Sequence, residues 1–377
     1  MYNFKKVYLN TYNNSIIELD FKDDIIKFKP KLMKLDFLVP ILTDFRSIFK
    51  SMIDNGESNG INLVTTYSCN LNCNYCFEGQ NKDKRIIKDI SKYNEIWKYI
   101  LPKITNPFSI AFFGGEPTLN KDSIYFFTNK IREYSKKKKT KYYLKMITNG
   151  TLIDKDFVNF FKPNEFSHIQ LTFDGNKKRH NEVRGYYDKI IDSIKEIYPI
   201  TSSIGVRYNI TKDNWTEIPI FIKDLTKKIP LNVQKKVYLS LGFIDSKDVQ
   251  ISELDLEKAI KSTIKLTNNS NIRFLSKPTQ KIKNCPAQQK KEAWIDFDGR
   301  KYFCERVIGQ KEYEITDTSK FDNFYPKDCF SCKLYPICGG YCWVQSELKQ
   351  DYYFNCLYSK AIAEEEIKKY LSKGAKK

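Results

Sequence analysis

Six short apolar segments between Ile61 and Phe243 constrain the fold of this 377-residue chain more than any other feature. Each is followed by a turn of polar or glycine residues and then by a stretch whose apolar positions have helical spacing. Strands that alternate with helices pair in parallel through right-handed crossovers. Six such units predict an α/β fold with an open, partial (β/α)6 barrel of the TIM type. The predicted strands are INLVTTY, FSIAFF, YLKMI, HIQLTF, IGVRYNI and VYLSLGF.

The unusual residues of the chain follow these strands. Three cysteines come after the first strand, GGE after the second, TNG after the third and DG after the fourth. In parallel α/β architectures, ligands bind and reactions occur at the carboxyl ends of the strands. Four polar strand ends in succession therefore predict one shared site.

The rest of the chain predicts three further regions around a barrel of residues 61–245. Residues 1–60 read as a small α+β element, with paired strands in KKVYLNTY and SIIELDF and a helix in LDFLVPILTDFRSIFKSMI. Residues 246–284 read as a helical bridge containing ISELDLEKAIKSTIKL. Residues 285–377 are cysteine-dense and loop-rich, and they close on the charged helix SKAIAEEEIKKYLSK.

The composition limits the cellular compartment and the kinds of metal site that we expect for this chain. The sequence has no apolar run long enough to cross a bilayer, and MYNFKKVYLNTYNN lacks the apolar core of a secretory signal, so we expect a cytoplasmic protein without a membrane partner. Ten cysteines in such a chain indicate metal binding or catalysis rather than disulfides. Of the two histidines, His168 falls in a predicted strand and His180 in a polar loop, and neither has a ligand-spaced partner, which favours all-thiolate sites.

The formal charge of +19 comes mostly from lysine, with the densest run at Lys136–Lys139. That run ends a predicted helix, where cations are favourable. Such a charge is compatible with a nucleic acid, an acidic membrane surface or an acidic peptide, and also with a solvated lysine-rich surface. The charge alone names no partner.

Cys69, Cys73 and Cys76 lie within eight residues and have no obvious fourth ligand nearby. Zinc sites usually use two pairs of ligands separated by a longer loop. A four-iron cluster held by three cysteines keeps one iron open, and that iron can bind a small molecule through an amine and a carboxylate.

This CxxxCxxC spacing after the first strand of a βα series resembles the signature of the radical S-adenosylmethionine (SAM) superfamily. The companion motifs stand in the matching order: an aromatic residue before the third cysteine, then GGE, TNG and DG. A structural zinc site is the alternative for the cysteines, and turn or surface roles are the alternative for the later polar residues. The resemblance implies SAM-pocket roles for Tyr75, Gly114, Gly115, Glu116, Asn149, Asp174 and Arg207.

The C-terminal cysteines resemble a SPASM domain, the extension found in radical SAM enzymes that mature peptides and proteins. The spacing of all seven cysteines, and of Gly299 between the first two, matches that pattern, with zinc knuckles as the alternative. The resemblance implies two auxiliary clusters and thus three 4Fe–4S clusters that use all ten cysteines. Its outer cluster would be held by Cys329, Cys332, Cys338 and Cys356, and its inner cluster by Cys285, Cys304 and Cys342.

The inner cluster departs from some relatives because PAQQKKEAW follows Cys285 without an eighth cysteine. Its fourth iron is therefore open or capped by another ligand, and an open iron can hold a substrate thiolate. Glu305 directly follows Cys304, at a position where the sulfatase-maturing branch carries a catalytic base. A solvated glutamate is the alternative.

The resemblance implies reductive cleavage of SAM to a 5′-deoxyadenosyl radical, with a flavodoxin- or ferredoxin-type protein as reductant. The preferred substrate is a ribosomally made precursor peptide that receives a thioether or carbon–carbon cross-link. Residues 1–60 would recognise its leader at a strand edge or simply cap the barrel. One alternative is an anaerobic sulfatase-maturing enzyme that oxidises Cys or Ser to formylglycine. The other is an iron–sulfur protein that binds nucleic acid, which the charge suggests and the cysteine pattern argues against.

Overall fold

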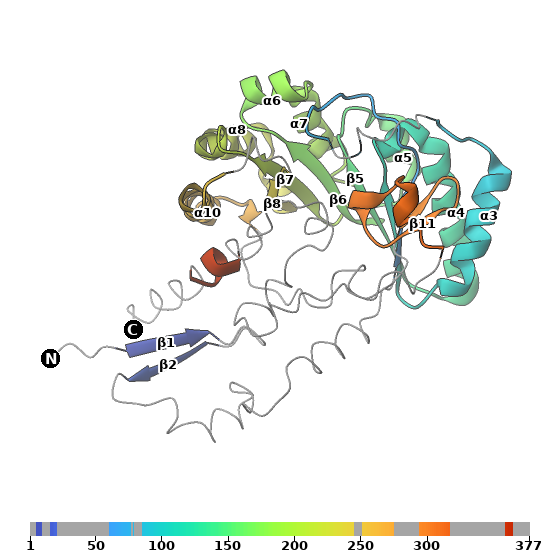
Figure 1. The fold of residues 1–377 in the computed structure, drawn as a ribbon, viewed down its shortest axis with the longest axis horizontal. Coiled ribbons are helices and arrows are strands. Elements are labelled where there is room, and N and C mark those ends of the chain that lie inside the picture. The colour runs from blue at the N-terminus through green and yellow to red at the C-terminus, as the bar shows by residue number, and fades with distance from the viewer. Residues whose placement is uncertain are drawn as a thin grey trace. The chain divides into compact units, whose positions relative to one another are not determined.

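The computed structural model describes residues 5–9, 16–20, 60–76, 78, 85–244, 251–274, 294–316 and 359–364 (Figure 1). These residues fall into two compact units. One unit contains the described residues from 60 to 274 together with 294–316, and the other contains 5–9, 16–20 and 359–364. Within the first unit, residues 294–316 pack with the barrel although the sequence predicted a separate domain from residue 285.

The small unit contains an antiparallel pair, β1 (Lys5–Leu9) and β2 (Ile16–Asp20), with Lys5 opposite Asp20 and Leu9 opposite Ile16. This confirms the strand pair predicted near the N-terminus. Residues 359–364 are helical and coincide with the start of the predicted C-terminal helix. The helix predicted in LDFLVPILTDFRSIFKSMI lies outside the described residues.

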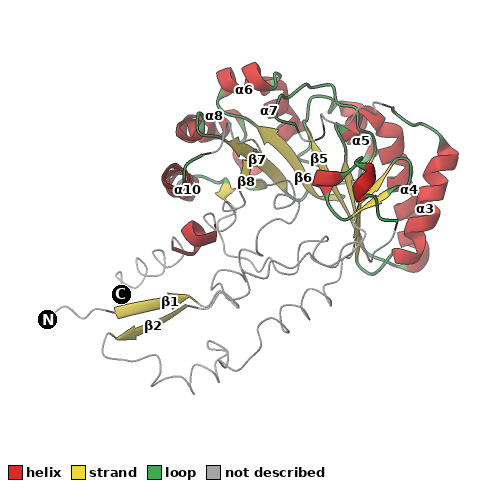
Figure 2. Ribbon diagram, viewed as in Figure 1, coloured by secondary structure: helices red, strands yellow, loops and turns green. Residues whose placement is uncertain are grey.

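The large unit is built on one nine-stranded sheet with the order β11-β10-β3-β4-β5-β6-β7-β8-β9 (Figure 2). Every neighbouring pair is parallel except β10–β11. The six predicted strands are confirmed as β3 (Gly60–Val64), β4 (Phe108–Phe113), β5 (Tyr142–Thr148), β6 (Phe166–Phe173), β7 (Ile204–Ile210) and β8 (Val237–Phe243).

Three further strands extend the sheet beyond this prediction. The first is β9 (Arg273–Phe274), which adds to β8. The other two form a hairpin, β10 (Trp294–Asp296) and β11 (Lys301–Tyr302), in which β10 pairs in parallel with β3. Strands of two or three residues are too short for a period-2 pattern, and the pairing of β10 with β3 joins segments far apart in the sequence.

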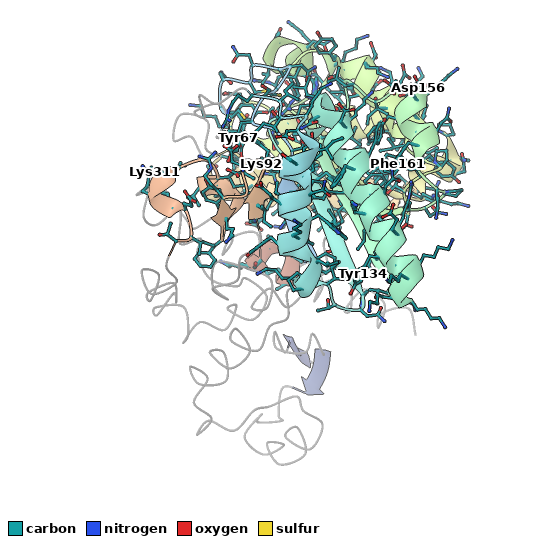
Figure 3. The ribbon with its side chains drawn as sticks, turned by 90° about the vertical axis from the view of Figure 1, so that its right-hand side faces the viewer. Tyr67, Lys92, Tyr134, Asp156, Phe161 and Lys311 are labelled. Carbon is teal, nitrogen blue, oxygen red and sulfur yellow. The ribbon has the colours of Figure 1, made fainter. Side chains whose placement is uncertain are left out.

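Helices connect the strands and cover one face of the sheet (Figure 1). In Figure 3, α3, which carries Lys92, lies beside α4, which carries Tyr134. The lysines at residues 136–138 form the last turn of α4, as predicted, and α10 confirms the helix predicted in the bridge. The helices are α3 (Ile90–Ile100), α4 (Lys121–Lys138), α5 (Lys155–Phe160), α6 (Lys177–Val183), α7 (Tyr187–Glu196), α8 (Ile218–Lys228), α9 (Leu231–Gln234) and α10 (Glu253–Asn268).

The two faces of the sheet differ because side chains alternate along each strand. In β5, Leu144 and Met146 are fully buried, whereas Tyr143 and Ile147 are more than one-third exposed. The buried set continues across the sheet with the apolar residues of β4, β6 and β7. No helix among the described residues is both long enough and apolar enough to cross a membrane.

Asn120, buried at the start of α4, joins three parts of this unit. Its Nδ2 donates to the carbonyl oxygens of Thr65 and Ile87, at 3.0 Å each. Its Oδ1 accepts from the hydroxyl of Tyr93 (3.1 Å) and from the backbone N–H of Ser123 (3.3 Å), so it also caps the helix. One side chain thus fixes the backbone directly after β3 against α3 and α4.

We expect Asn120→Ala to lower the free energy of unfolding by about 2–4 kcal/mol, because it leaves several buried polar groups without partners. Asn129→Ala is the matched control, since Asn129 is an exposed residue of the same helix. Its effect should stay within about 0.5 kcal/mol. Urea unfolding measures both, and equal effects of the two substitutions would contradict the role assigned to Asn120.

Candidate functional site

The three cysteines predicted to form one site line one cavity. Cys69, Cys73 and Cys76 lie on the loop after β3, and each thiol is half-buried. The cavity has a volume of about 260 Å³ and also contains residues from the ends of β4, β5 and β6. The site therefore lies at the carboxyl edge of the parallel sheet, as the sequence predicted.

Gly114 and Gly115 bring the end of β4 into backbone contact with this loop. A Cβ at Gly114 would lie 2.2 Å from the carbonyl oxygen of Thr66, and one at Gly115 would lie 2.5 Å from that of Ser68. Gly114 also has a φ of +152°, which disfavours any other residue. The close approach allows Gly115 N–H to donate to Thr66 O (3.0 Å) and Glu116 N–H to Ser68 O (2.8 Å).

Glu116, the last residue of the GGE motif, is fully buried and joins the ends of β4 and β5. Its carboxylate accepts from the Thr118 hydroxyl (2.5 Å) and N–H (3.1 Å), the Thr148 hydroxyl (2.6 Å) and the Asn149 N–H (2.6 Å). Burial raises the pKa of Glu116, and these four donors oppose the shift. Its side chain is committed to internal contacts, so the motif offers mainly its backbone to a ligand.

Asn149 connects the end of β5 to the cysteine loop. Its Nδ2 donates to Asn70 Oδ1 at 2.9 Å and lies 3.8 Å from the sulfur of Cys69. Its Oδ1 accepts from both the N–H (2.9 Å) and the hydroxyl (2.7 Å) of Thr151. The amide is therefore held in one orientation, with its donor side toward the cysteines.

Tyr75 and Asp174, both predicted for the site, meet in a buried hydrogen-bonded group. The Tyr75 hydroxyl donates to Asp174 Oδ1 at 2.5 Å. Arg184 donates from Nε to Asp174 Oδ2 (2.7 Å) and from Nη2 to the Tyr75 hydroxyl (2.6 Å). Asn209 Nδ2 donates to both Tyr75 and Asp174, at 3.0 Å each.

The positive charge of Arg184 in this group affects the nearby cysteines. Arg184 lines the cavity, and its side chain is only 11% exposed. Burial raises the pKa of the Cys73 thiol, and the Arg184 guanidinium opposes that shift. Burial tends to lower the pKa of Arg184 itself, but Tyr75 and Asp174 hold it above its ordinary value. The cavity thus contains a cation that stays charged.

Arg207 lies in β7, opposite the cavity-lining Thr172 of β6. Its Nε donates to Asn209 Oδ1 at 3.0 Å, and its guanidinium passes so close to Gly242 that a Cβ there would lie 2.2 Å from Nε. Arg207 is not among the residues that line the cavity, so its proposed contact with a SAM carboxylate stays a prediction. Burial and the nearby Arg306 lower its pKa.

Glu305, predicted as a base, begins a 3-10 turn directly after Cys304. Burial raises its pKa, and Arg207 opposes the shift, so the carboxylate and the guanidinium lie within electrostatic range. Glu305 does not line the cysteine cavity. A catalytic role for it stays a prediction.

His180 supports Asp174 from behind. The prediction of a polar loop was wrong, because His180 lies in α6 and is fully buried against the rings of Phe173 and Tyr187. Its Nδ1 accepts from the backbone N–H of Asp174 (3.2 Å), and burial lowers its pKa to about 4. His168 lies in β6 as predicted, where Nδ1 contacts the Ser203 hydroxyl at 3.0 Å.

Of the ten predicted cluster ligands, the structure describes Cys69, Cys73, Cys76 and Cys304. The other six, which the SPASM resemblance requires, lie outside the described residues: Cys285, Cys329, Cys332, Cys338, Cys342 and Cys356. Among the described side chains, no three of His, Cys, Asp or Glu are close enough together to enclose a single metal ion. A four-iron cluster binds each thiolate to a different iron, so its ligands lie farther apart than the ligands of a single metal ion. Three thiols around one cavity fit that wider arrangement.

Sequence reasoning missed several residues of this site. Arg184 follows Asp174 by ten positions without a motif or period that marks it. Asn209 could have been predicted as a site residue, because it lies on the same strand face as Arg207, two positions earlier. The supporting hydroxyls of Thr118 and Thr148 become visible only when the ends of β4 and β5 are adjacent.

The fold and the site define an α/β protein with a partial barrel and a cysteine-lined cavity at the carboxyl edge of its parallel sheet. Residues 63–225 match the Radical SAM superfamily, and the chain therefore contains a radical SAM domain. That segment runs from β3 into α8 and includes every described residue of the cysteine cavity.

Individual relatives agree with this assignment. The chain is 33% identical over 155 residues to a protein named cysteine-type anaerobic sulfatase-maturating enzyme from Clostridium novyi, and the match covers 38% of this chain and 40% of that relative. The match thus spans less than half of that relative's length.

Two solved structures share the fold. The structure "Native anSMEcpe with bound AdoMet" matches with a TM-score of 0.60 and 19% identity, covering 81% of this chain and 96% of that one. Streptococcus suis SuiB bound to precursor peptide SuiA matches with a TM-score of 0.58 and 18% identity, covering 92% of this chain and 94% of that one. At these identities the likeness supports the radical SAM fold.

His180 predicts a dependence of stability on pH. Its pKa in the fold, about 4, lies below its ordinary value of 6.5, so the unfolded chain binds more protons between these values. Stability from this residue is complete above pH 6.5 and is lost as the pH falls toward 4, by about 3 kcal/mol in total.

His180→Gln keeps an oxygen that can accept from the Asp174 N–H but does not titrate in this range. Urea unfolding from pH 7 to pH 4.5 should show a smaller loss of stability for the variant than for the wild type. The two share every other titrating group, including His168. Parallel pH profiles would refute the assignment.

Proposed function

We propose that this chain is a radical SAM enzyme that modifies a peptide. When bound, a 4Fe–4S cluster and SAM supply an electron and a 5′-deoxyadenosyl radical that removes a hydrogen atom from the substrate. The observation that carries the proposal is the cavity in which three thiols face the GGE backbone at the carboxyl edge of a parallel sheet.

The chain's own residues suit this ligand pair. Cys69, Cys73 and Cys76 would hold the cluster, and three thiolates leave one iron for a ligand that brings its own amine and carboxylate. The charged Arg184 in the cavity wall suits an anionic group of that ligand. Gly114 and Gly115 also line the cavity, and backbone carbonyl oxygens there would suit the ammonium end.

The buried group of Tyr75, Asp174, Arg184 and Asn209 keeps the cavity preorganised. Its hydrogen bonds satisfy one another before any ligand enters, so little reorganisation accompanies binding. The ring of Tyr75 also lines the cavity and offers an apolar surface to a nucleobase. Water is restricted by the half-buried position of the three thiols.

For the substrate, we propose a ribosomally made precursor peptide that acquires a thioether or carbon–carbon cross-link. Support comes from the likeness in fold to SuiB, which was solved with a precursor peptide, and from the SPASM-like cysteine spacing. In this proposal residues 1–60 bind the leader, residues 285–377 hold two auxiliary clusters, and a cytoplasmic flavodoxin or ferredoxin supplies electrons. The excess of lysine suits an acidic leader.

Sulfatase maturation is the second candidate. The relatives named cysteine-type anaerobic sulfatase-maturating enzyme favour it, at 33% and 37% identity over parts of the chain. In that case Glu305 is the candidate base for oxidation of a Cys or Ser side chain. The missing eighth cysteine and the additional N-terminal element favour the cross-linking enzyme.

Substitution of single cysteines distinguishes the clusters. After anaerobic reconstitution we expect about twelve irons per wild-type chain and about eight for either Cys73→Ala or Cys304→Ala. Cys73→Ala should lose cleavage of SAM to 5′-deoxyadenosine, because it removes a ligand of the radical-forming cluster. Cys304→Ala should retain cleavage and lose peptide modification. About four irons per wild-type chain would contradict the three-cluster proposal.

A short cysteine- or aromatic-rich peptide encoded next to the gene of this chain would be the natural test substrate. Incubation with SAM and reductant under anaerobic conditions, followed by mass spectrometry, should show a product lighter by two hydrogen atoms. Fragmentation should map the loss to a bond between two residues. A loss confined to one Cys or Ser side chain of a sulfatase peptide would support the second candidate.

A further inference from the structure

A buried hydrogen bond joins the cysteine loop to the β10–β11 hairpin. Tyr67 stands two positions before Cys69, and its hydroxyl donates to Asp296 Oδ2 at 2.8 Å. Both residues are 1% exposed, and 229 positions separate them in the sequence. The hydroxyl therefore adds a side-chain link between two segments that the pairing of β10 with β3 brings together.

Asp296 is a fixed acceptor for this bond. Its Oδ2 also accepts from Arg300 Nε (2.8 Å), and its Oδ1 accepts from the backbone N–H groups of Asp298 and Arg300 (2.9 Å each). Gly299, with a φ of +83°, makes the tight turn that brings these donors back to the carboxylate. The hairpin thus orients its own carboxylate and presents one oxygen to Tyr67.

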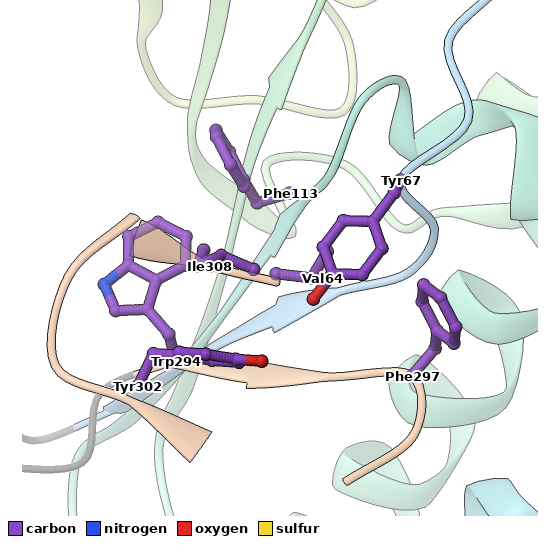
Figure 4. Close-up of a cluster of buried hydrophobic side chains, with 7 residues drawn as sticks. All are labelled: Val64, Tyr67, Phe113, Trp294, Phe297, Tyr302 and Ile308. Carbon is purple, nitrogen blue, oxygen red and sulfur yellow. The ribbon is translucent and has the colours of Figure 1, made fainter. Parts of the chain in front are cut away.

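Tyr67 belongs to a cluster of buried hydrophobic side chains that includes Phe113, Trp294 and Phe297 (Figure 4). The ring of Tyr67 packs edge-on against Phe297 with centroids 5.0 Å apart, and Phe113 packs in the same way on Trp294 at 5.0 Å. Tyr67 and Phe113 both line the cysteine cavity as well. The hairpin is therefore packed behind the wall of the proposed SAM site, and the full cluster is Val64, Tyr67, Phe113, Trp294, Phe297, Tyr302 and Ile308.

The segment that follows this hairpin carries Cys304, a predicted ligand of the inner auxiliary cluster. Tyr302, the last residue of β11, is fully buried in the hydrophobic cluster, and Cys304 and Glu305 follow within three positions. A displacement of the hairpin would thus move the cavity wall and Cys304 together. The Tyr67–Asp296 hydrogen bond would therefore couple the position of the cavity wall to the position of Cys304.

We propose that Tyr67 and Asp296 are positioning residues that fix the cysteine loop relative to the segment carrying Cys304. They act through their mutual hydrogen bond, by holding the Cys69 end of the loop in the geometry that SAM cleavage requires. This inference rests on the proposed function. It adds that the radical-forming half of the site depends on a contact with the C-terminal part of the chain.

Tyr67→Phe tests the inference, because it removes the hydroxyl and keeps the ring in the cluster. Tyr187→Phe is the matched control, since Tyr187 is also 1% exposed and its hydroxyl donates to Asp224 at the same 2.8 Å, from α7. Both variants lose one Tyr–Asp hydrogen bond. The bond of Tyr187 is part-buried, because the Asp224 side chain is 31% exposed, so Tyr187→Phe should lower the melting temperature no more than Tyr67→Phe does. A purely structural role would make them alike in every other measurement.

The expected difference lies in the loop. In the apoprotein, amide hydrogen exchange of residues 65–76 should become faster in Tyr67→Phe and stay unchanged in Tyr187→Phe. After reconstitution the two should hold equal iron. The change in the reduced-cluster electron paramagnetic resonance spectrum on adding SAM should be altered only in Tyr67→Phe, and 5′-deoxyadenosine formation should fall about 10- to 100-fold in that variant alone.

Asp296→Asn provides a second, independent test of the inference. Because it perturbs the same contact from the hairpin side, the double variant Tyr67→Phe/Asp296→Asn should lose little more activity than the more impaired single variant. Additive losses, or a Tyr67→Phe protein with wild-type exchange, spectrum and cleavage, would overturn the inference. A wild-type protein that binds iron but never cleaves SAM would instead overturn the proposed function, and the exchange comparison in the apoprotein would still decide the positioning claim.

Discussion

The approach of two backbones without intervening side chains is the constraint on which the site depends. Gly114 and Gly115 lie so close to the carbonyls of the segment from Thr66 to Ser68 that neither could carry a methyl group without displacing the loop. The contact makes the start of the loop an extension of the sheet edge through two N–H···O bonds. The positions of the three thiols follow from it.

Two buried groups of ionisable side chains lie around this contact, and the two groups have different roles. Glu116 is a buried carboxyl group surrounded by donors, and its role is to hold β4 and β5 together. Arg184 is a cation held by Asp174 and Tyr75, and it faces the cavity. Each buried charge has partners, as it must in a medium that solvates ions poorly. Of these two side chains, only Arg184 is among the residues that line the cavity.

Much of this arrangement could be read from the sequence, because local signals and topology agree. The periodicity of apolar positions predicted strands β3 to β8 and the helices between them, and the parallel order placed the polar strand ends at one edge. Tyr75, Asn149 and Asp174 were predicted from motifs, and the structure brings them around the cysteine cavity or into the group behind it. Their individual contacts with SAM stay predictions.

What could not be read depends on contacts between distant segments. Arg184 and Asn209 become part of the site only through the packing of α6 and β7 against Asp174. His180 was assigned to a loop because its neighbours are polar, although the fold buries its ring beneath the site. Strand β10 pairs with β3 across more than two hundred residues, a distance over which sequence patterns carry no pairing information.

The pairing of β10 with β3 has a consequence for the order in which the chain matures. Until residues 294–296 have been synthesised, β3 exposes one unpaired strand edge, and Tyr67 has no acceptor for its hydroxyl. The barrel strands can assemble during translation, but the wall behind the cysteine loop is closed only by a segment made much later. A nascent chain therefore has a barrel before it has a finished site, and this interval is an opportunity for cluster insertion before the loop is fixed.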